Sequence, residues 1–119
     1  MAIALPEIEA RRCVDALERS SHTLISAVTL AEVLLVSESR DVRSKVEALI
    51  DGLVIEVCPA DQNTSRRVVE IYRRWGKRNH SANLNFVDCF SYELAASRSC
   101  PLLFVGNDFS QTDIRSALA

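Results

Sequence analysis

Short apolar segments alternate with helical patterns along this chain, and that alternation limits the possible folds more than any other feature. The segments 22–26, 54–58 and 101–106 are rich in β-branched and other apolar residues and are predicted to be strands. Helices are predicted between and around them, beginning near Ala10, Thr29, Asp41, Asp61 and Phe86, and Asp41 is expected to cap its helix. We therefore expect a single α/β domain over residues 1–119, with a parallel sheet whose carboxyl edge carries any site.

The segment 84–95 is predicted to be a covered helix with one acid in its first turn. Asn85 is a good N-cap, and Asp88 follows it by three residues. One explanation for Asp88 is capping and helix-dipole stabilisation, which is worth about 0.3–1 kcal/mol. The other is a cation ligand in a cleft. A second acidic segment, which contains Asp108 and Asp113 directly after the last predicted strand, favours the ligand.

Four acids are candidates for one site, although each also has an ordinary explanation. Glu32 interrupts an apolar helix, where a charge is costly unless it is paired or bound to metal, so a salt bridge or an edge position would also explain it. Asp108 and Asp113 stand in common turn sequences. Together with Asp88 they form an oxygen ligand set suited to Mg²⁺ or Mn²⁺. Such an ion can activate water and stabilise a phosphodiester under attack.

Other ligands and compartments are less well supported. The four cysteines show no CxxC and no Cys/His pairing at zinc spacing, which is typical of small core residues in a reducing compartment, so we expect a cytoplasmic protein. No apolar run approaches the length of about 20 residues that spans a membrane, so no membrane partner is expected. The net charge of −2 argues against general electrostatic binding of nucleic acid, but it permits a local basic patch.

Such a patch is predicted between residues 66 and 78, where only Glu70 opposes the basic side chains. It is either the solvated face of an amphipathic helix or a ridge that follows the phosphates of a nucleic acid. Its members are Arg66, Arg67, Arg73, Arg74, Lys77 and Arg78, with His80 following. Trp75 and Tyr72 are expected in the core and not at the surface.

The order of several motifs resembles the PIN-domain family, and in particular the VapC-like toxins of bacterial toxin–antitoxin modules. The motifs are residues 25–32, 72–77, 84–90, 102–109 and 112–114. The resemblance implies a three-layer α/β/α sandwich, a Mg²⁺- or Mn²⁺-dependent ribonuclease acting on RNA, frequent homodimers and an antitoxin partner. It assigns catalytic and metal-binding roles to Glu32, Asp88 and Asp108, with Asp113 as a supporting metal ligand.

The sequence departs from this family at its start. The family opens with a strand that ends in an acid, whereas residues 1–7 align with the helix that follows it. We therefore expect the first, central strand and its acid to be absent, with the gap closed by direct pairing of the flanking strands, by a neighbouring chain or, as we favour, by residues upstream of Met1. The alternative function is a non-catalytic PIN-like binding module that keeps the dimer and antitoxin surfaces. A phosphatase is less well supported, because no nucleophilic aspartate motif ends a predicted strand.

Overall fold

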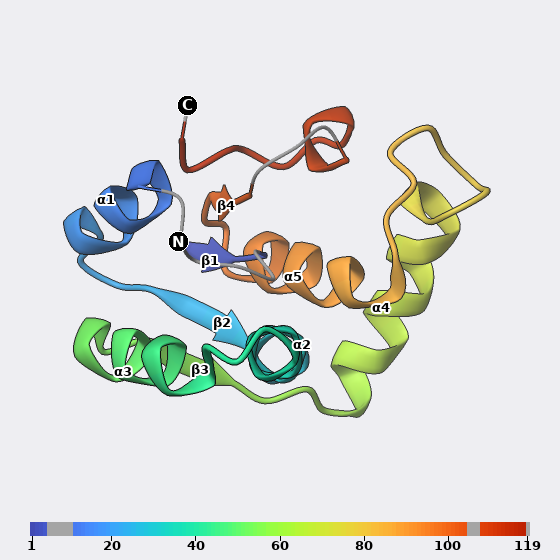
Figure 1. The fold of residues 1–119 in the computed structure, drawn as a ribbon. Coiled ribbons are helices and arrows are strands. Elements are labelled where there is room, and N and C mark those ends of the chain that lie inside the picture. The colour runs from blue at the N-terminus through green and yellow to red at the C-terminus, as the bar shows by residue number, and fades with distance from the viewer. Residues whose placement is uncertain (5–10, 105–107, 119) are drawn as a thin grey trace.

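The computed structural model describes residues 1–4, 11–104 and 108–118, and a parallel sheet lies at its centre (Figure 1). Its strands are β1 (Ala2–Ile3), β2 (Leu24–Ser26), β3 (Glu56–Cys58) and β4 (Leu102–Leu103). Their order across the sheet is β3-β2-β1-β4, and every pairing between neighbours is parallel. The predicted parallel sheet is confirmed, and each of the three predicted strand segments contains one strand.

The expectation that the central strand is absent is wrong. Ala2 and Ile3 form that strand, in register with β2 on one side and β4 on the other, and both side chains are fully buried. The helix with which residues 1–7 were aligned begins at Arg11 in the described part of the chain. The expected absence of an acid at the end of this strand concerns residues 5–10, which lie outside the described residues.

Backbone pairing explains why so short a segment takes the central position. Ala2 N–H donates to the carbonyl of Pro101 at 3.0 Å, and Leu24 N–H donates to the carbonyl of Met1 at 2.8 Å. Two residues after Ala2, the Ala4 N–H donates to the carbonyl of Leu103 at 3.0 Å. A buried backbone group left unpaired costs about 1–3 kcal/mol, so pairing on both edges favours any short apolar segment within reach. Neither direct pairing of β2 with β4 nor an added segment is needed.

Helices cover both faces of the sheet, which gives the predicted three layers (Figure 1). Helices α1 (Arg11–Arg19) and α3 (Arg43–Leu53) lie on one side, and α5 (Phe86–Ser97) lies against the other side with α4 (Gln62–Trp75) packed on it. Helix α2 (Ala27–Ser39) follows β2 directly and contacts both α3 and α5. None of the helices in the described segments is long and apolar enough to cross a membrane.

Alternating side chains of the strands divide the core in two. Ile3 and Ile25 point toward the helices α1, α2 and α3, where they join one cluster of buried residues. Ala2 and Leu24, their neighbours along the strands, join the other cluster with α4 and α5. A sheet covered on both faces requires this period of two, and the period determines which side chains of each strand face each layer of helices.

Helix starts follow the sequence in two cases and differ in one. Asp61 caps α4 and Asn85 caps α5, each within a reciprocal capping box. The predicted cap at Asp41 is wrong, because Val42 precedes α3 without any side-chain cap. Asp41 instead adopts a φ of 58°, a left-handed conformation that aspartate tolerates better than most residues and that turns the chain from α2 into α3.

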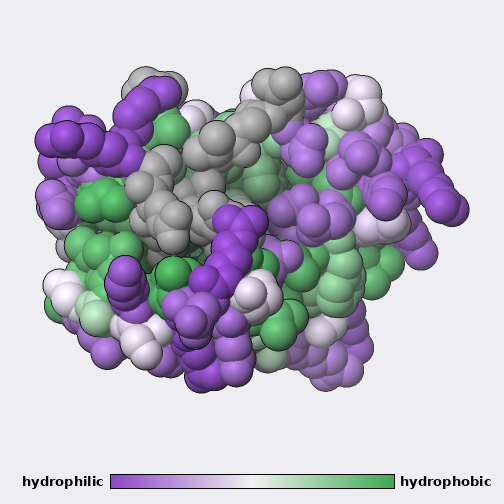
Figure 2. Space-filling model, in the orientation of Figure 1, coloured by the Kyte–Doolittle hydropathy of each residue, from purple (hydrophilic) through white to green (hydrophobic). Residues whose placement is uncertain are grey.

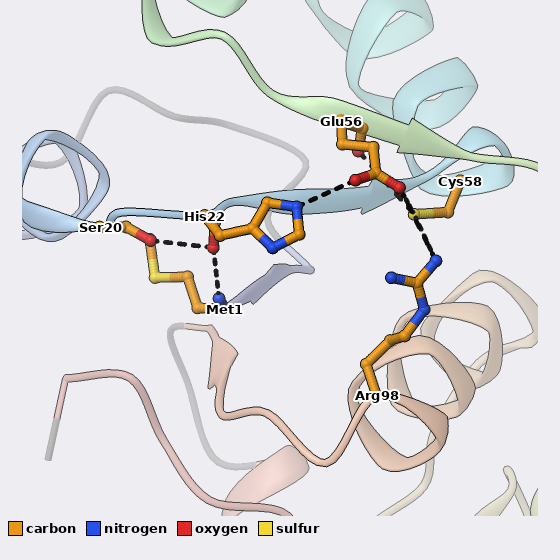
Figure 3. A network of polar contacts seen from close by, with 6 residues as sticks. All are labelled: Met1, Ser20, His22, Glu56, Cys58 and Arg98. Carbon is orange, nitrogen blue, oxygen red and sulfur yellow. Dashed lines mark hydrogen bonds and ion pairs between the residues drawn. The ribbon is translucent and has the colours of Figure 1, made fainter.

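A polar network at the amino edge of the sheet holds the chain terminus and β3 in place (Figure 3). The Met1 ammonium donates to the carbonyl of His22 at 2.8 Å, which fixes the start of β1 beside β2. The His22 imidazole contacts Glu56 on β3 at 2.9 Å, and Arg98, just after α5, contacts the same carboxylate at 3.7 Å. The network links the start of β1, the segment before β2 and the end of α5 to the edge strand β3.

Candidate active site

Asp88 lies in the first turn of α5, at the carboxyl edge of the sheet. Its backbone N–H donates to Asn85 Oδ1 at 2.8 Å, and its Oδ2 accepts the Asn85 backbone N–H at 3.1 Å. The capping explanation for Asp88 is therefore correct, but it involves only one carboxylate oxygen in the hydrogen bonds between described residues. The other oxygen remains available for a ligand.

A buried hydrogen bond joins α5 to α2 one turn away from Asp88. Thr29 Oγ1 and Ser91 Oγ lie 2.6 Å apart, and each hydroxyl is almost completely buried. Glu32 follows Thr29 by three residues on α2, and Asp88 precedes Ser91 by three residues on α5, so each acid lies one turn from the bond on its own helix. The bond therefore sets the position of Glu32 relative to Asp88.

Asp108 reaches the same region from the segment after β4. It precedes a short 3₁₀ helix (Phe109–Gln111), which it does not cap with its side chain. Phe109 is buried and packs on Phe104 with ring centroids 5.3 Å apart, which anchors the segment to the core. The Asp108 carboxylate is left exposed.

Electrostatic coupling shows that the structure brings three of the predicted acids together. Burial, together with the charges of Glu32 and Asp108, raises the pKa of Asp88 to about 6 against the opposing Asn85 hydrogen bond. Burial also raises the pKa of Glu32. None of the ion pairs between described residues involves Glu32, so the salt bridge considered for it is not found there.

Asp113 is placed differently. It is exposed and accepts a hydrogen bond from the hydroxyl of Tyr92, one turn along α5 from Asp88. Burial, followed by this hydrogen bond and the charge of Asp113, raises the pKa of Tyr92 to about 12. Asp113 is not among the charges that raise the pKa of Asp88. Asp113 is therefore held by Tyr92, and its charge does not raise the pKa of Asp88 as the charges of Glu32 and Asp108 do.

The chemistry of the three central side chains fits a hard divalent cation, since all are carboxylates. At Asp88 and Glu32, burial also favours the neutral form. Their spacing is looser than that of a preformed metal cage. Within the ranges 1–4, 11–104 and 108–118, no group of three or more His, Cys, Asp or Glu side chains is close enough to hold a metal ion. The arrangement can hold a proton on Asp88 up to about pH 6, and it concentrates negative charge at one point of the surface.

The predicted basic patch lies on α4 and in the loop that follows, where hydrophilic residues gather (Figure 2). All six basic side chains are exposed. Arg67 contacts the buried Glu93 at 3.3 Å, Arg73 contacts Glu70 at 2.8 Å, and Arg74 lies 4.5 Å from the centre of the Trp75 ring. Several of these cations thus support the packing of α4 in addition to their exposure to solvent.

Three residues around the site were missed by sequence reasoning. Thr29 and Ser91 are small polar residues inside helices, and nothing in their local sequence distinguishes them from ordinary surface positions. Tyr92 was read as part of an apolar helix, although a buried tyrosine generally needs a partner for its hydroxyl. That rule is a signal that could have connected it to one of the downstream acids.

Comparisons with known proteins agree on one family. Residues 1–115 match the family model of the PIN domain. Ribonuclease VapC42 of Mycobacterium tuberculosis is 38% identical over 122 aligned residues, which cover 98% of this chain and 92% of that protein. Ribonuclease VapC28 of the same organism is 35% identical, with coverage of 99% and 92%. A solved toxin–antitoxin complex from Klebsiella pneumoniae contains a chain of the same fold, with a TM-score of 0.72, 16% identity, and coverage of 95% of this chain and 93% of that one.

Proposed function

The chain belongs to the PIN-domain family, and from that premise we propose that it is a metal-dependent endoribonuclease and the toxin of a toxin–antitoxin pair. The observation that carries the proposal is the group of Glu32, Asp88 and Asp108, in which burial and mutual repulsion raise the pKa of Asp88. Carboxylates are rarely gathered in this way unless a cation or a proton is to be held between them. The relatives named as ribonucleases, which match nearly the whole chain, support the same reaction.

Glu32, Asp88 and Asp108 would hold Mg²⁺ or Mn²⁺, with Asp113 as an outer support. When bound, such an ion supplies an activated water and neutralises charge on the phosphodiester. The chain's own contribution is placement. The capping box fixes Asp88, the Thr29–Ser91 hydrogen bond fixes the distance between α2 and α5, and Tyr92 holds Asp113. Ionised Asp88 would attract the cation, and neutral Asp88 would retain a proton in its absence.

Partners follow from the same proposal. We expect an RNA substrate, an antitoxin protein that blocks the carboxylates, and a homodimer. The Klebsiella chain of the same fold comes from a toxin–antitoxin complex, which supports the antitoxin, and the ribonuclease names of the relatives support RNA. We place the protein in the cytoplasm, where its four free cysteines would remain reduced.

A second candidate function is a binding module that keeps the dimer and antitoxin surfaces and hydrolyses nothing. One observation favours it, namely that the described residues hold no preformed group of three metal ligands. The two functions differ in a single readout, which is cleavage of RNA by the purified chain.

The test is an RNA cleavage assay in millimolar Mn²⁺ or Mg²⁺, with and without a chelator. The parent chain should cleave, and Glu32→Gln, Asp88→Asn and Asp108→Asn should each lower the rate by a hundredfold or more, roughly the cost of losing one strong electrostatic stabiliser. Asp51→Asn, an exposed acid on α3, is the control and should cleave at the parent rate. A parent rate that the chelator does not change would refute metal dependence, and no cleavage by the parent would favour the binding module.

A further inference from the structure

Phe86 is a large aromatic residue in a position that hydrophobicity does not explain. It is the first residue of α5 and is 63% exposed. Its ring meets Phe90 edge to face, with centroids 5.1 Å apart, but only Phe90 is buried in the core. Most of the stabilisation that a phenylalanine gains from burial is therefore not gained here.

A groove begins at this ring. Its walls come from Val68, Val69 and Tyr72 on α4 and from Asn85 and Phe86 at the start of α5, and its volume is about 440 Å³. Val69 is itself 50% exposed. A single exposed apolar side chain is ordinary, but two that face one hollow together with a half-buried tyrosine form a surface suited to a flat apolar ligand. We call it the Phe86 groove.

Two cations border the Phe86 groove. Arg73 pairs with Glu70 at 2.8 Å, whereas none of the ion pairs between described residues involves Lys77. An exposed aromatic ring beside basic side chains is the arrangement with which proteins bind single-stranded nucleic acid, because bases stack on the ring while the cations contact phosphates. An apolar protein partner would use the ring but would have no need of the cations.

The groove lies at the same end of α5 as Asp88. Phe86 and Asp88 lie in the same turn of α5, about 3 Å apart along the helix axis and on different sides of it. Asn85 belongs to both, since it lines the groove and caps the helix through Asp88. Because residues two apart project about 200° from each other around a helix, a strand that contacts both Asp88 and Phe86 would cross the amino terminus of α5 beside Asn85.

We propose that the Phe86 groove binds an unpaired base of single-stranded RNA next to the phosphate at Asp88, by stacking on Phe86, while Lys77 contacts the backbone. This inference rests on the proposed ribonuclease function and adds a residue that would position the substrate. Phe86 is a positioning residue, because it touches the base and not the reacting phosphate.

Binding in the absence of cleavage tests the inference. All variants carry Asp88→Asn, and the probe is a fluorescein-labelled single-stranded RNA of random sequence, about a dozen nucleotides long, read by anisotropy. Phe86→Ala should weaken binding by roughly 5- to 150-fold, which corresponds to the loss of one stacked base. Phe86→Trp should retain the affinity, and Leu35→Ala, an exposed apolar residue on α2, should leave it unchanged. Lys77→Ala should lower the slope of affinity against salt by about one.

A second probe isolates the base. The same sugar–phosphate chain without bases should bind the parent and Phe86→Ala equally. Phe86→Ala with parental RNA affinity would overturn the inference, and so would an equal loss in Leu35→Ala. If Phe86→Ala converted a dimer to a monomer by light scattering while RNA affinity stayed the same, the groove would hold a second copy of the chain and the inference would fail.

Cleavage by the chain with Asp88 intact separates this inference from the ribonuclease proposal. If the chain cleaves RNA but Phe86→Ala does not change RNA affinity, the stacking inference alone is refuted. Phe86-dependent binding without cleavage by that chain refutes the ribonuclease and retains the base site. An absence of RNA binding by the Asp88→Asn parent overturns the base site as well.

Discussion

Asp88 and Asp61 each belong to a capping box but hold opposite positions in it: Asp61 is the N-cap and accepts the amide of Thr64, whereas Asp88 is the N3 residue and accepts the amide of Asn85. Both accept a backbone N–H within a capping box at the start of a helix. At Asp61, hydrogen bonds from Thr64 lower the pKa of the exposed carboxyl. At Asp88, burial and the charges of Glu32 and Asp108 outweigh the hydrogen bond from the Asn85 amide, and the pKa rises to about 6. Capping explains why an acid occurs at position 88, but it does not explain why other acids were placed around it.

The raised pKa of Asp88 predicts how stability depends on pH. Below the ordinary pKa of about 4 the group is neutral in both states and has no effect. As pH rises, the unfolded chain ionises first, so the free energy of unfolding falls until the folded carboxyl ionises near pH 6. Asp88→Asn removes this loss while keeping an oxygen that can accept the Asn85 N–H. It should melt above the parent at about pH 7.5, with the difference shrinking toward about pH 4.5.

Asp61→Asn is the matched control for that measurement. In the parent, the folded state lowers the pKa of the Asp61 carboxyl, so the Asp61 charge contributes stability above the ordinary pKa. This contribution is lost as pH falls through the folded pKa. The variant should therefore melt below the parent at about pH 7.5. Thermal melts of the three proteins over this range decide the matter. A melting temperature of Asp88→Asn below that of the parent at about pH 7.5 would contradict the raised pKa of Asp88.

Divalent ions should stabilise the native state through the same three acids. An ion that binds only the folded chain raises the free energy of unfolding by about 2.7 kcal/mol at a hundred times its dissociation constant. The melting temperature of the parent should thus increase with Mn²⁺, and Asp88→Asn should show a much smaller increase. Asp51→Asn should respond as the parent does. A response that all three share would indicate binding elsewhere on the chain.

At the scale of elements, the site depends on how α2 and α5 pack. Both helices are largely apolar toward each other, and apolar contact alone allows small sliding movements. The Thr29–Ser91 hydrogen bond, at 2.6 Å between buried hydroxyls, selects one arrangement. Buried polar pairs of this kind add specificity when both partners are satisfied, and they are costly when one is removed.

A double-mutant cycle tests this role. Thr29→Val and Ser91→Ala each leave one buried hydroxyl without its partner, so each should lower the free energy of unfolding by about 1–3 kcal/mol. The double variant leaves none, and its cost should be smaller than the sum of the two. Urea denaturation measures the three values. Additive costs would show that the hydroxyls do not act as a pair.

Sequence reasoning recovered the elements whose signals are local. The start of α5 was predicted at Phe86 because Asn85 and Asp88 form a recognisable capping pair, and α4 was predicted from Asp61 for the same reason. It failed at Asp41, where capping and left-handed turns favour the same residue type, and at β1, where two residues are too few for any periodicity. The acids could be proposed from residue type, but the hydroxyls that position them belong to a contact between distant helices.

At the scale of the whole molecule, the two halves of the core meet on the central strand. Ile3 joins the cluster with α1, α2 and α3, while Ala2 joins the cluster with α4 and α5. The carboxylates come from α2, from α5 and from the segment after β4; α2 contacts β2 and β3, while α5 contacts β1, β2 and β4. Their relative positions therefore depend on a sheet that β1 holds together.

Hydrogen exchange tests whether Ala2 and Ala4 hold that central position in solution. Residues at a chain terminus normally exchange their amide hydrogens rapidly, since the end of a chain frays at almost no cost. Here the Ala2 and Ala4 amides donate to carbonyls next to and within β4, in the interior of the sheet, so opening them must separate β1 from a strand between two helical layers. Their protection should approach that of the buried Ala95 amide in α5, and it should exceed that of the exposed Arg12 amide in the first turn of α1.

Ile3→Ala should cost about 2–5 kcal/mol of unfolding free energy and lower the protection of both amides. If the Ala2 and Ala4 amides exchanged as fast as an unfolded terminus while Ala95 stayed protected, then the central position would not be held by these residues, and the arrangement of the three acids around it would need another support.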